Sequence, residues 1–227
     1  MVAFDAKDPV AVLIGCKRPP HTLVRRIAVH PDHLRKGHGR HLLTSLSAKL
    51  AILGPPHLLA ELDAGNAPAR ALFKACGWRE ERIYVDYLAA APAASPAPPG
   101  LVIPVTASDL SDVALPASDA PRSWERTRGT LLARDERLLG LAISGGERLD
   151  ASVLYTRDAG GSVSIWSLFS TDPALLAVLL RDLAHRERTP LTIPRLDETE
   201  IDGSLLRDLG FVPAGSTIGV AAEATPA

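Results

Sequence analysis

The sequence contains little cysteine and few aromatic residues, and it has no long hydrophobic run. Its two cysteines, Cys16 and Cys76, stand far apart without metal-ligand spacing, which argues against a disulfide framework and indicates reduced thiols. No apolar stretch reaches the roughly eighteen residues that a membrane helix requires, so no membrane partner is expected. The first ten residues carry acids and lack the apolar segment of a signal peptide, so the expected location is cytoplasmic.

Hydrophobic residues make up 46% of the 227 positions and aromatic residues only 4%, which predicts a core built mainly from Leu, Val, Ile and Ala. The net charge of -1 hides an asymmetry. Residues 1–90 hold 13 Lys and Arg against 8 Asp and Glu, whereas residues 91–227 hold 12 against 18. This basic excess is modest and lacks interleaved aromatic residues, which disfavours nucleic acid and favours a small phosphate-bearing ligand.

An uncharged segment, AAAPAASPAPPG at residues 89–100, separates two periodic regions and predicts a semi-rigid linker. The two halves, 1–88 and 101–227, show a similar order of elements. Near their ends, LFKACGW at residues 72–78 aligns with LLRDLGF at residues 205–211. We therefore predict a diverged tandem repeat.

Hydrophobic periodicity predicts both strands and helices in each half, and so an α/β fold. In the first half we expect strands at 9–15, 23–29, 58–62 and 83–88, and helices from Gly39 to 54 and over 66–77. In the second half we expect strands at 163–169, 191–193 and 218–221, and helices at 173–185 and 201–209.

A basic, glycine-bearing loop joins a strand to a helix in the stretch IAVHPDHLRKGHGRHLL, residues 27–43. Gly37 and Gly39 allow backbone N–H groups to approach a ligand closely, and the following helix directs its positive N-terminal end to the same place. This combination predicts pyrophosphate binding. The spacing fits neither the dinucleotide fingerprint, whose third glycine would fall on Leu42, nor a P-loop.

Together with the strand Ile27-Ala28-Val29, the turn His30-Pro31-Asp32 and the later segment from Asn66 to Gly77-Trp78, this loop resembles the GNAT superfamily of N-acetyltransferases. The resemblance covers residues 1–88 well and the second half in outline. It implies two GNAT-like halves, each a mixed, mostly antiparallel sheet flanked by helices, and acetyl-CoA as co-substrate. The residues that it assigns to acetyl-CoA binding are Ile27, Ala28, Val29, Arg35, Lys36, Gly37, His38, Gly39, Arg40, Asn66 and Phe73.

The resemblance further implies transfer of acetyl to a primary amine by direct attack in a ternary complex. The backbone N–H of Val29 would polarise the thioester carbonyl, and Glu61 or Asp63 would act as base through water. The tyrosine that serves the family as general acid is replaced here by Phe73. The first position of the family's loop, usually Gln or Arg, is Leu34. An alternative function is therefore a non-catalytic protein that binds CoA or acyl-CoA as sensor or assembly partner. A third is a structural protein without ligand.

The first half lacks the family's first strand and two helices, which cover the acceptor site, so a partner subunit that supplies a strand would make a homodimer. The second half lacks the glycine loop and is expected to be a degenerate copy. Four histidines, His30, His33, His38 and His41, lie close together in sequence, but no cysteine or cluster of acidic residues completes a metal site, so no metal is predicted. Tyr84 and Tyr87 are further candidates for the missing acid.

Overall fold

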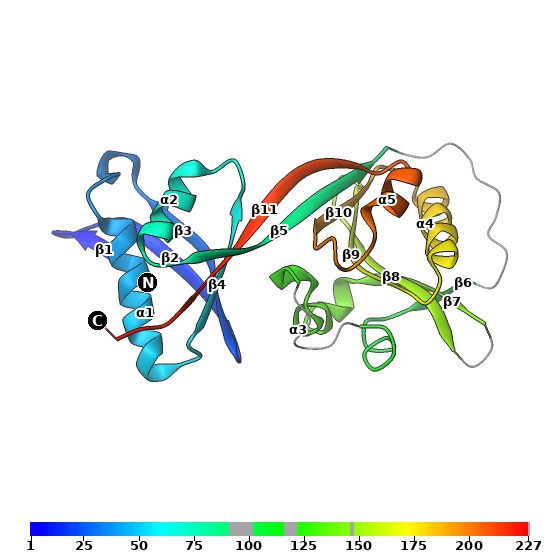
Figure 1. Cartoon of the computed structure of the whole chain (residues 1–227), viewed down its shortest axis with the longest axis horizontal. Coiled ribbons are helices and arrows are strands. Elements are labelled where there is room, and N and C mark those ends of the chain that lie inside the picture. Colours follow the sequence, from blue (N-terminus) through cyan, green and yellow to red (C-terminus); the bar gives the residue numbers. More distant parts are fainter. Residues whose placement is uncertain (91–101, 116–121, 146–147, 227) are drawn as a thin grey trace. The chain divides into compact units, whose positions relative to one another are not determined.

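The computed structural model describes residues 1–90, 102–115, 122–145 and 148–226 (Figure 1). The chain divides into two compact units, of which unit 1 holds Met1–Ile83 with Thr217–Ala227 and unit 2 holds Tyr84–Ser216. The predicted α/β class with a mixed sheet is confirmed. Most of the predicted linker lies outside the described residues.

Unit 1 places its strands in the order β1-β2-β3-β4-β11. Neighbouring strands are antiparallel except β3 and β4, which are parallel. The strand β1 was not predicted; it pairs with β2 through a two-residue turn. The elements are β1 (Val2–Asp5), β2 (Asp8–Arg18), β3 (His21–Val29), α1 (His38–Leu53), β4 (His57–Asp63), α2 (Ala67–Ala75) and the C-terminal part of β11 (Val212–Glu223).

The helix α1 packs on β1, β2 and β3 (Figure 1). Leu42, Leu43, Leu46 and Leu50 recur at helical spacing and are buried, with Leu43 completely inaccessible. The helix ends at Gly54, whose φ of +51° suits glycine, immediately before Pro55. These leucines join Phe73 and Trp78 in a core shared by both helices and the sheet.

Two long strands, β5 and β11, each begin in one unit and end in the other. Residues Thr217–Glu223 of β11 pair antiparallel with Asp63–His57 of β4, and Ile218 and Val220 enter the core of unit 1. Conversely, β5 (Arg79–Ala89), which follows α2, pairs through residues 85–89 with β10 of unit 2. The compact units therefore differ from the halves 1–88 and 101–227, because the alternation of a strand shows that it has a buried face but not which strand it pairs with.

Unit 2 repeats the order of unit 1. Its strands follow the sequence β5-β10-β9-β8-β7-β6, and β9 and β10 are parallel as β3 and β4 are. The strands β7 and β8 were not predicted. The elements are β6 (Val102–Val105), α3 (Arg128–Leu132), β7 (Leu139–Ser144), β8 (Leu149–Arg157), β9 (Val163–Ser170), α4 (Pro173–Glu187), β10 (Leu191–Leu196) and α5 (Gly203–Asp208).

A buried ion pair lies inside unit 2. The side chain of Arg126 is fully inaccessible and that of Glu200 is 2% exposed, with Nη2 and Oε2 3.1 Å apart. Arg126 Nη1 also donates to the carbonyl oxygens of Ile165 on β9, at 3.0 Å, and Pro194 on β10, at 3.4 Å. The guanidinium thus joins the two strands just beyond Ser164, the last β9 residue that pairs with β10.

We predict that Val220→Asp lowers the free energy of unfolding by at least about 3 kcal/mol, because it places a carboxylate at a position that is 4% exposed. Val212→Asp, on the same strand at a position that is 57% exposed, is the matched control and should change stability by less than about 0.5 kcal/mol. Urea unfolding followed by circular dichroism measures both. Equal losses would show that β11 does not complete the core of unit 1.

We also predict that Arg126→Ala lowers the free energy of unfolding by about 3–5 kcal/mol, because it leaves the Glu200 carboxylate buried with fewer hydrogen-bond donors. The comparison is Arg128→Ala. The ion-pair partner of Arg128 is Asp112, whose side chain is 87% exposed, so this substitution should lower the free energy of unfolding by less than about 1 kcal/mol. The same unfolding measurement applies. A loss for Arg126→Ala no larger than that for Arg128→Ala would contradict the buried pair.

Candidate functional site

The strands β3 and β4 separate part of the way along their length. They pair in parallel from His21 with His57 to Val24 with Ala60, where their register ends. Beyond this point β3 stays paired with β2 as far as Val29, and β4 stays paired with β11 as far as Asp63. The later residues of both strands therefore present backbone edges to the space that opens between them.

The backbone N–H of Val29 points into this space. The next residue, His30, donates its N–H to the carbonyl of Val10 on β2, at 2.8 Å. Because successive N–H groups of an extended strand point to opposite edges, the N–H groups of Val29 and Ile27 face the β4 side. The position predicted for an oxyanion donor thus has the required direction.

The basic loop that follows β3 turns sharply into α1. Arg35 and Gly37 have positive φ values of +62° and +89°, and Gly37 is the N-cap of the helix without a side-chain cap. The first intrahelical bond runs from the N–H of His41 to the carbonyl of Gly37 at 2.9 Å. The N–H groups of residues 38–40 precede this bond, and no acidic residue lies in the first turn. This end of α1 is therefore suited to bind an anion.

Gly39 has a packing function in addition to its place in the loop. It is buried, and a Cβ atom there would lie 3.0 Å from Leu72 Cδ2 of α2 and 3.7 Å from Val29 Cγ2 of β3. Glycine therefore lets the start of α1 approach both elements closely. A large substituent at this position would disturb the packing as well as any ligand.

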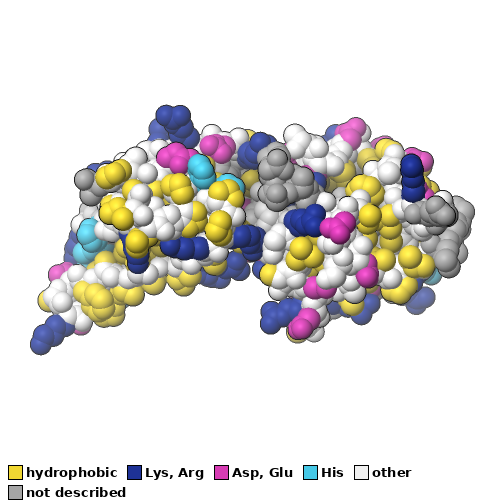
Figure 2. Space-filling model, turned by 90° about the horizontal axis from the view of Figure 1, so that it is seen from below, with side chains coloured by type: hydrophobic (Ala, Val, Ile, Leu, Met, Phe, Trp, Pro, Cys, Tyr) yellow, Lys and Arg dark blue, Asp and Glu magenta, His cyan; other side chains and the backbone are white. Residues whose placement is uncertain are grey.

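Positive charge accompanies the site. Unit 1 holds 13 Lys and Arg against 8 Asp and Glu, and unit 2 holds 12 against 18. Arg35, Lys36 and Arg40 are exposed around the start of α1. Figure 2 shows several Lys and Arg side chains beside hydrophobic ones on the visible face of unit 1. The surroundings of the loop thus favour an anionic ligand.

The remaining predicted site residues occupy different environments. Asn66 caps α2, because its Oδ1 accepts the N–H of Ala69 at 3.0 Å. Phe73 is 1% exposed and its ring packs edge-on against Trp78 at a centroid distance of 4.9 Å, so it is a core residue. Glu61 is half-buried and directly follows Ala60, on the face of β4 opposite Ala60 and Leu62. It therefore lies where β4 leaves β3.

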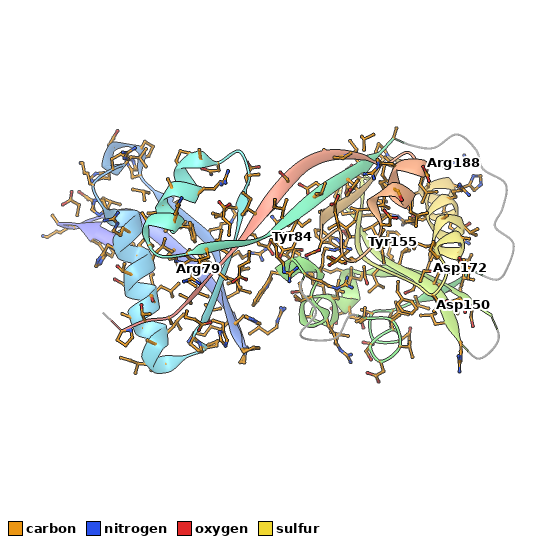
Figure 3. The ribbon with its side chains drawn as sticks, in the orientation of Figure 1. Arg79, Tyr84, Asp150, Tyr155, Asp172 and Arg188 are labelled. Carbon is orange, nitrogen blue, oxygen red and sulfur yellow. The ribbon has the colours of Figure 1, made fainter. Side chains whose placement is uncertain are left out.

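The two tyrosines predicted as candidates for the missing acid, Tyr84 and Tyr87, both belong to unit 2. Tyr87 belongs to unit 2, where its hydroxyl donates to Glu198 at 2.9 Å, and burial raises its pKa. Tyr84, labelled in Figure 3, is also buried in unit 2. Burial likewise raises the pKa of the free thiol of Cys76, which keeps that group protonated.

Unit 2 has the same arrangement of strands but a different chemistry at the corresponding positions. Asp172, labelled at the start of α4 in Figure 3, accepts the N–H of Ala174 at 2.8 Å. A carboxylate thus occupies the helix end that is free in α1, and it would repel a phosphate. Between β9 and β10, Arg126 already binds the strand carbonyls. No sequence signal identified Arg126 as a residue of this kind.

Known proteins resemble this chain both in sequence and in fold. Residues 1–78 match the model of the acetyltransferase (GNAT) family. A tandem GNAT protein from the clavulanic acid biosynthesis pathway matches with a TM-score of 0.62 and 17% identity, covering 100% of this chain and 82% of that one. A GCN5-related N-acetyltransferase from Sphaerobacter thermophilus matches with a TM-score of 0.67 and 15% identity, covering 97% and 79%. At these identities the structural matches establish the fold.

A third solved structure, Eis1 from Mycobacterium abscessus, has a TM-score of 0.55 and 15% identity over 96% of this chain and 62% of its own. No curated protein matches the sequence significantly. None of the helices in the described ranges is both long and apolar enough to cross a membrane. Residues 1–78 therefore match the GNAT acetyltransferase family in sequence, and the whole chain shares the fold of tandem GNAT proteins.

Proposed function

We propose that the protein is an N-acetyltransferase that moves an acetyl group from acetyl-CoA to a primary amine at a single site in unit 1. One observation carries this proposal. The space between β3 and β4 opens at the end of β3 where the N–H of Val29 points into it, and the anion-binding start of α1 follows directly in the chain. Acetyl-CoA carries its phosphates and its thioester at opposite ends, and this site offers donors for both.

Binding would use the backbone more than side chains. The N–H groups of residues 38–40 would donate to the pyrophosphate, with Lys36 and Arg40 supplying charge around it. The edge of β3 at Ile27 and Val29 would bond to the amide groups of the pantetheine arm as a neighbouring strand does. Asn66 caps α2 through Oδ1, which leaves its Nδ2 for a contact with the same arm.

In the chemical step, the amine nitrogen attacks the thioester carbon, a C–N bond forms and the C–S bond breaks, releasing CoA as thiolate. The N–H of Val29 would stabilise the negative charge on the carbonyl oxygen. Glu61 would accept the proton of the attacking amine through water. Because Phe73 has no ionisable group, the thiolate would take its proton from solvent.

Unit 2 is proposed to bind no acetyl-CoA. The Asp172 carboxylate at the start of α4 and the Arg126 guanidinium between β9 and β10 occupy the two positions that the ligand would need. We accordingly expect one acetyl-CoA per chain. The strand β11 runs from unit 2 into unit 1, where its residues Thr217–Glu223 pair with β4.

The buried Phe73 at the position of the family's tyrosine favours a second candidate function, a non-catalytic protein that binds CoA or acyl-CoA. The two functions share the binding site and differ only in turnover. Release of free CoA thiol with a panel of polyamines, amino acids, aminoglycosides and peptide N-termini separates them. Binding without turnover by any amine would support the second function.

We predict that Lys36→Glu and Arg40→Glu each weaken acetyl-CoA binding at least tenfold, because they place a carboxylate beside the pyrophosphate. Isothermal titration of acetyl-CoA into the full chain measures the affinity and the stoichiometry. The matched control is Lys49→Glu, an exposed lysine near the other end of α1, which should alter the affinity less than twofold.

Charge reversal in the loop is preferable to a change of Gly39, whose packing against Leu72 would confound the result. Absence of binding to the unaltered protein would refute both the enzyme and the CoA-binding function. Equal effects of Lys36→Glu and Lys49→Glu would place the ligand elsewhere. A stoichiometry of two would contradict the assignment of unit 2.

We predict that Glu61→Gln lowers kcat at least about 100-fold and leaves the KM for acetyl-CoA within threefold, because it removes the base but not the binding groups. It should also remove the acidic limb of the pH profile of kcat. The control is Asp63→Asn, since the Oδ1 atom that accepts the N–H of Gly65 at 2.8 Å is retained in asparagine. An unchanged kcat for Glu61→Gln would exclude Glu61 as the base.

A further inference from the structure

Three side chains with metal-ligating atoms converge beside the basic loop. Asp5 lies at the turn between β1 and β2, His33 lies in the 3-10 helix Pro31–His33, and His38 is the first residue of α1. One ligating atom from each lies within 4.8 Å of the others. The cluster thus draws on three separate segments of unit 1.

His33 is the best-defined member of the cluster. Its Nδ1 lies 3.4 Å from Asp5 Oδ2, and the His33 and His38 ring centroids are 5.9 Å apart. Within the part of the chain that the structure describes, this Nδ1 is buried and has no hydrogen-bond partner. Buried polar atoms in proteins normally have a partner. Here a proton on the ring nitrogen would allow a hydrogen bond to the carboxylate, and a metal ion would be bound by both groups.

The ligand types indicate which ion would bind. Two imidazoles and one carboxylate suit Zn²⁺, which takes three such protein ligands and leaves a fourth position for water. Mg²⁺ and Ca²⁺ prefer oxygen ligands throughout. With metal–ligand bonds of about 2.0–2.2 Å, ligands of a tetrahedral ion lie about 3.3–3.6 Å apart. His33 Nδ1 and Asp5 Oδ2 already meet this spacing, and the side chain of Asp5 is 58% exposed and free to adjust.

We propose that Asp5, His33 and His38 form a Zn²⁺ site that ties the N-terminal hairpin to the start of α1. From the sequence we expected no metal, because neither a cysteine nor a cluster of acidic residues accompanies the four histidines in the loop. The fold supplies a further carboxylate from 28 positions upstream of His33, since the pairing of β1 with β2 brings Asp5 to the loop. This site goes beyond the proposed function. It shares His38 with the proposed acetyl-CoA site, but it uses the imidazole of that residue, whereas the pyrophosphate would use its backbone N–H.

A neighbouring histidine, His30, is not included in the proposed site. The ring centroid of His30 lies 5.8 Å from that of His33, but its Nδ1 accepts the N–H of Asp32 at 3.3 Å. A second histidine–carboxylate pair, His57 Nδ1 and Glu223 Oε1 at 2.5 Å, lies at the opposite end of β4, with His21 nearby. This pair serves as an internal comparison because it offers similar ligands away from the loop.

The test is titration of Zn²⁺ into the tag-free full chain after chelator treatment, with acetyl-CoA absent. We expect one ion per chain. Asp5→Asn, an exposed and conservative change, and His33→Gln should each weaken binding at least about tenfold. His57→Gln should alter the Zn²⁺ affinity less than twofold. Co²⁺ in place of Zn²⁺ should give the visible absorption of a tetrahedral ion, and Asp5→Asn should reduce it.

Failure of the unaltered protein to bind Zn²⁺ would overturn the proposal. So would binding that His57→Gln abolishes while Asp5→Asn and His33→Gln leave it unchanged. Circular dichroism of each variant is the control for retained folding. Because the titration contains no acetyl-CoA, a negative result here leaves the acetyltransferase proposal intact, and a failure of acetyl-CoA to bind leaves this one intact.

Discussion

The candidate site depends on the antiparallel pairing between β4 and the C-terminal part of β11. A strand that leaves its neighbour exposes backbone groups, and such groups are costly unless another partner takes them. β4 leaves β3 after Ala60 and keeps its pairing with β11 as far as Asp63, while β3 keeps its pairing with β2 as far as Val29. Each strand thus retains one full set of hydrogen bonds, and the space between them is held open by the sheet itself. A segment more than 150 residues away in the sequence is in this way part of the site.

The two units show how one topology is made to serve different purposes. In unit 1 a glycine begins the helix after the central strand, and in unit 2 an aspartate does. The glycine leaves the first N–H groups of α1 available for an anion. The aspartate accepts one of the first N–H groups of α4 and adds negative charge there. Between the diverging strands, unit 2 contains a buried guanidinium that bonds to both. A few side chains, with no change in strand order, therefore distinguish the proposed acetyl-CoA site of unit 1 from the corresponding positions of unit 2.

Much of the fold followed from local sequence. The strands and helices of unit 1 that follow the first hairpin lie where apolar periodicity and the stop signals at Gly54 and Gly77 placed them, because those signals act within a few residues. The glycine loop was found for the same reason. The exchange of β5 and β11 was not foreseen, because pairing partners are chosen by contacts distant in sequence. Arg126 and Asp5 were missed likewise, since each gains its significance only from groups that the fold brings to it.

The position of β11 at the C-terminal end of the chain has a consequence for biosynthesis. Residues 1–83 leave the ribosome long before Thr217, so β4 is made well before the strand that pairs with it. Throughout that interval the edge of β4 and the apolar surface that Ile218 and Val220 later cover are exposed. Unit 1 therefore completes its folding only after synthesis has passed unit 2, and an interrupted chain would present an unpaired sheet edge to chaperones and proteases.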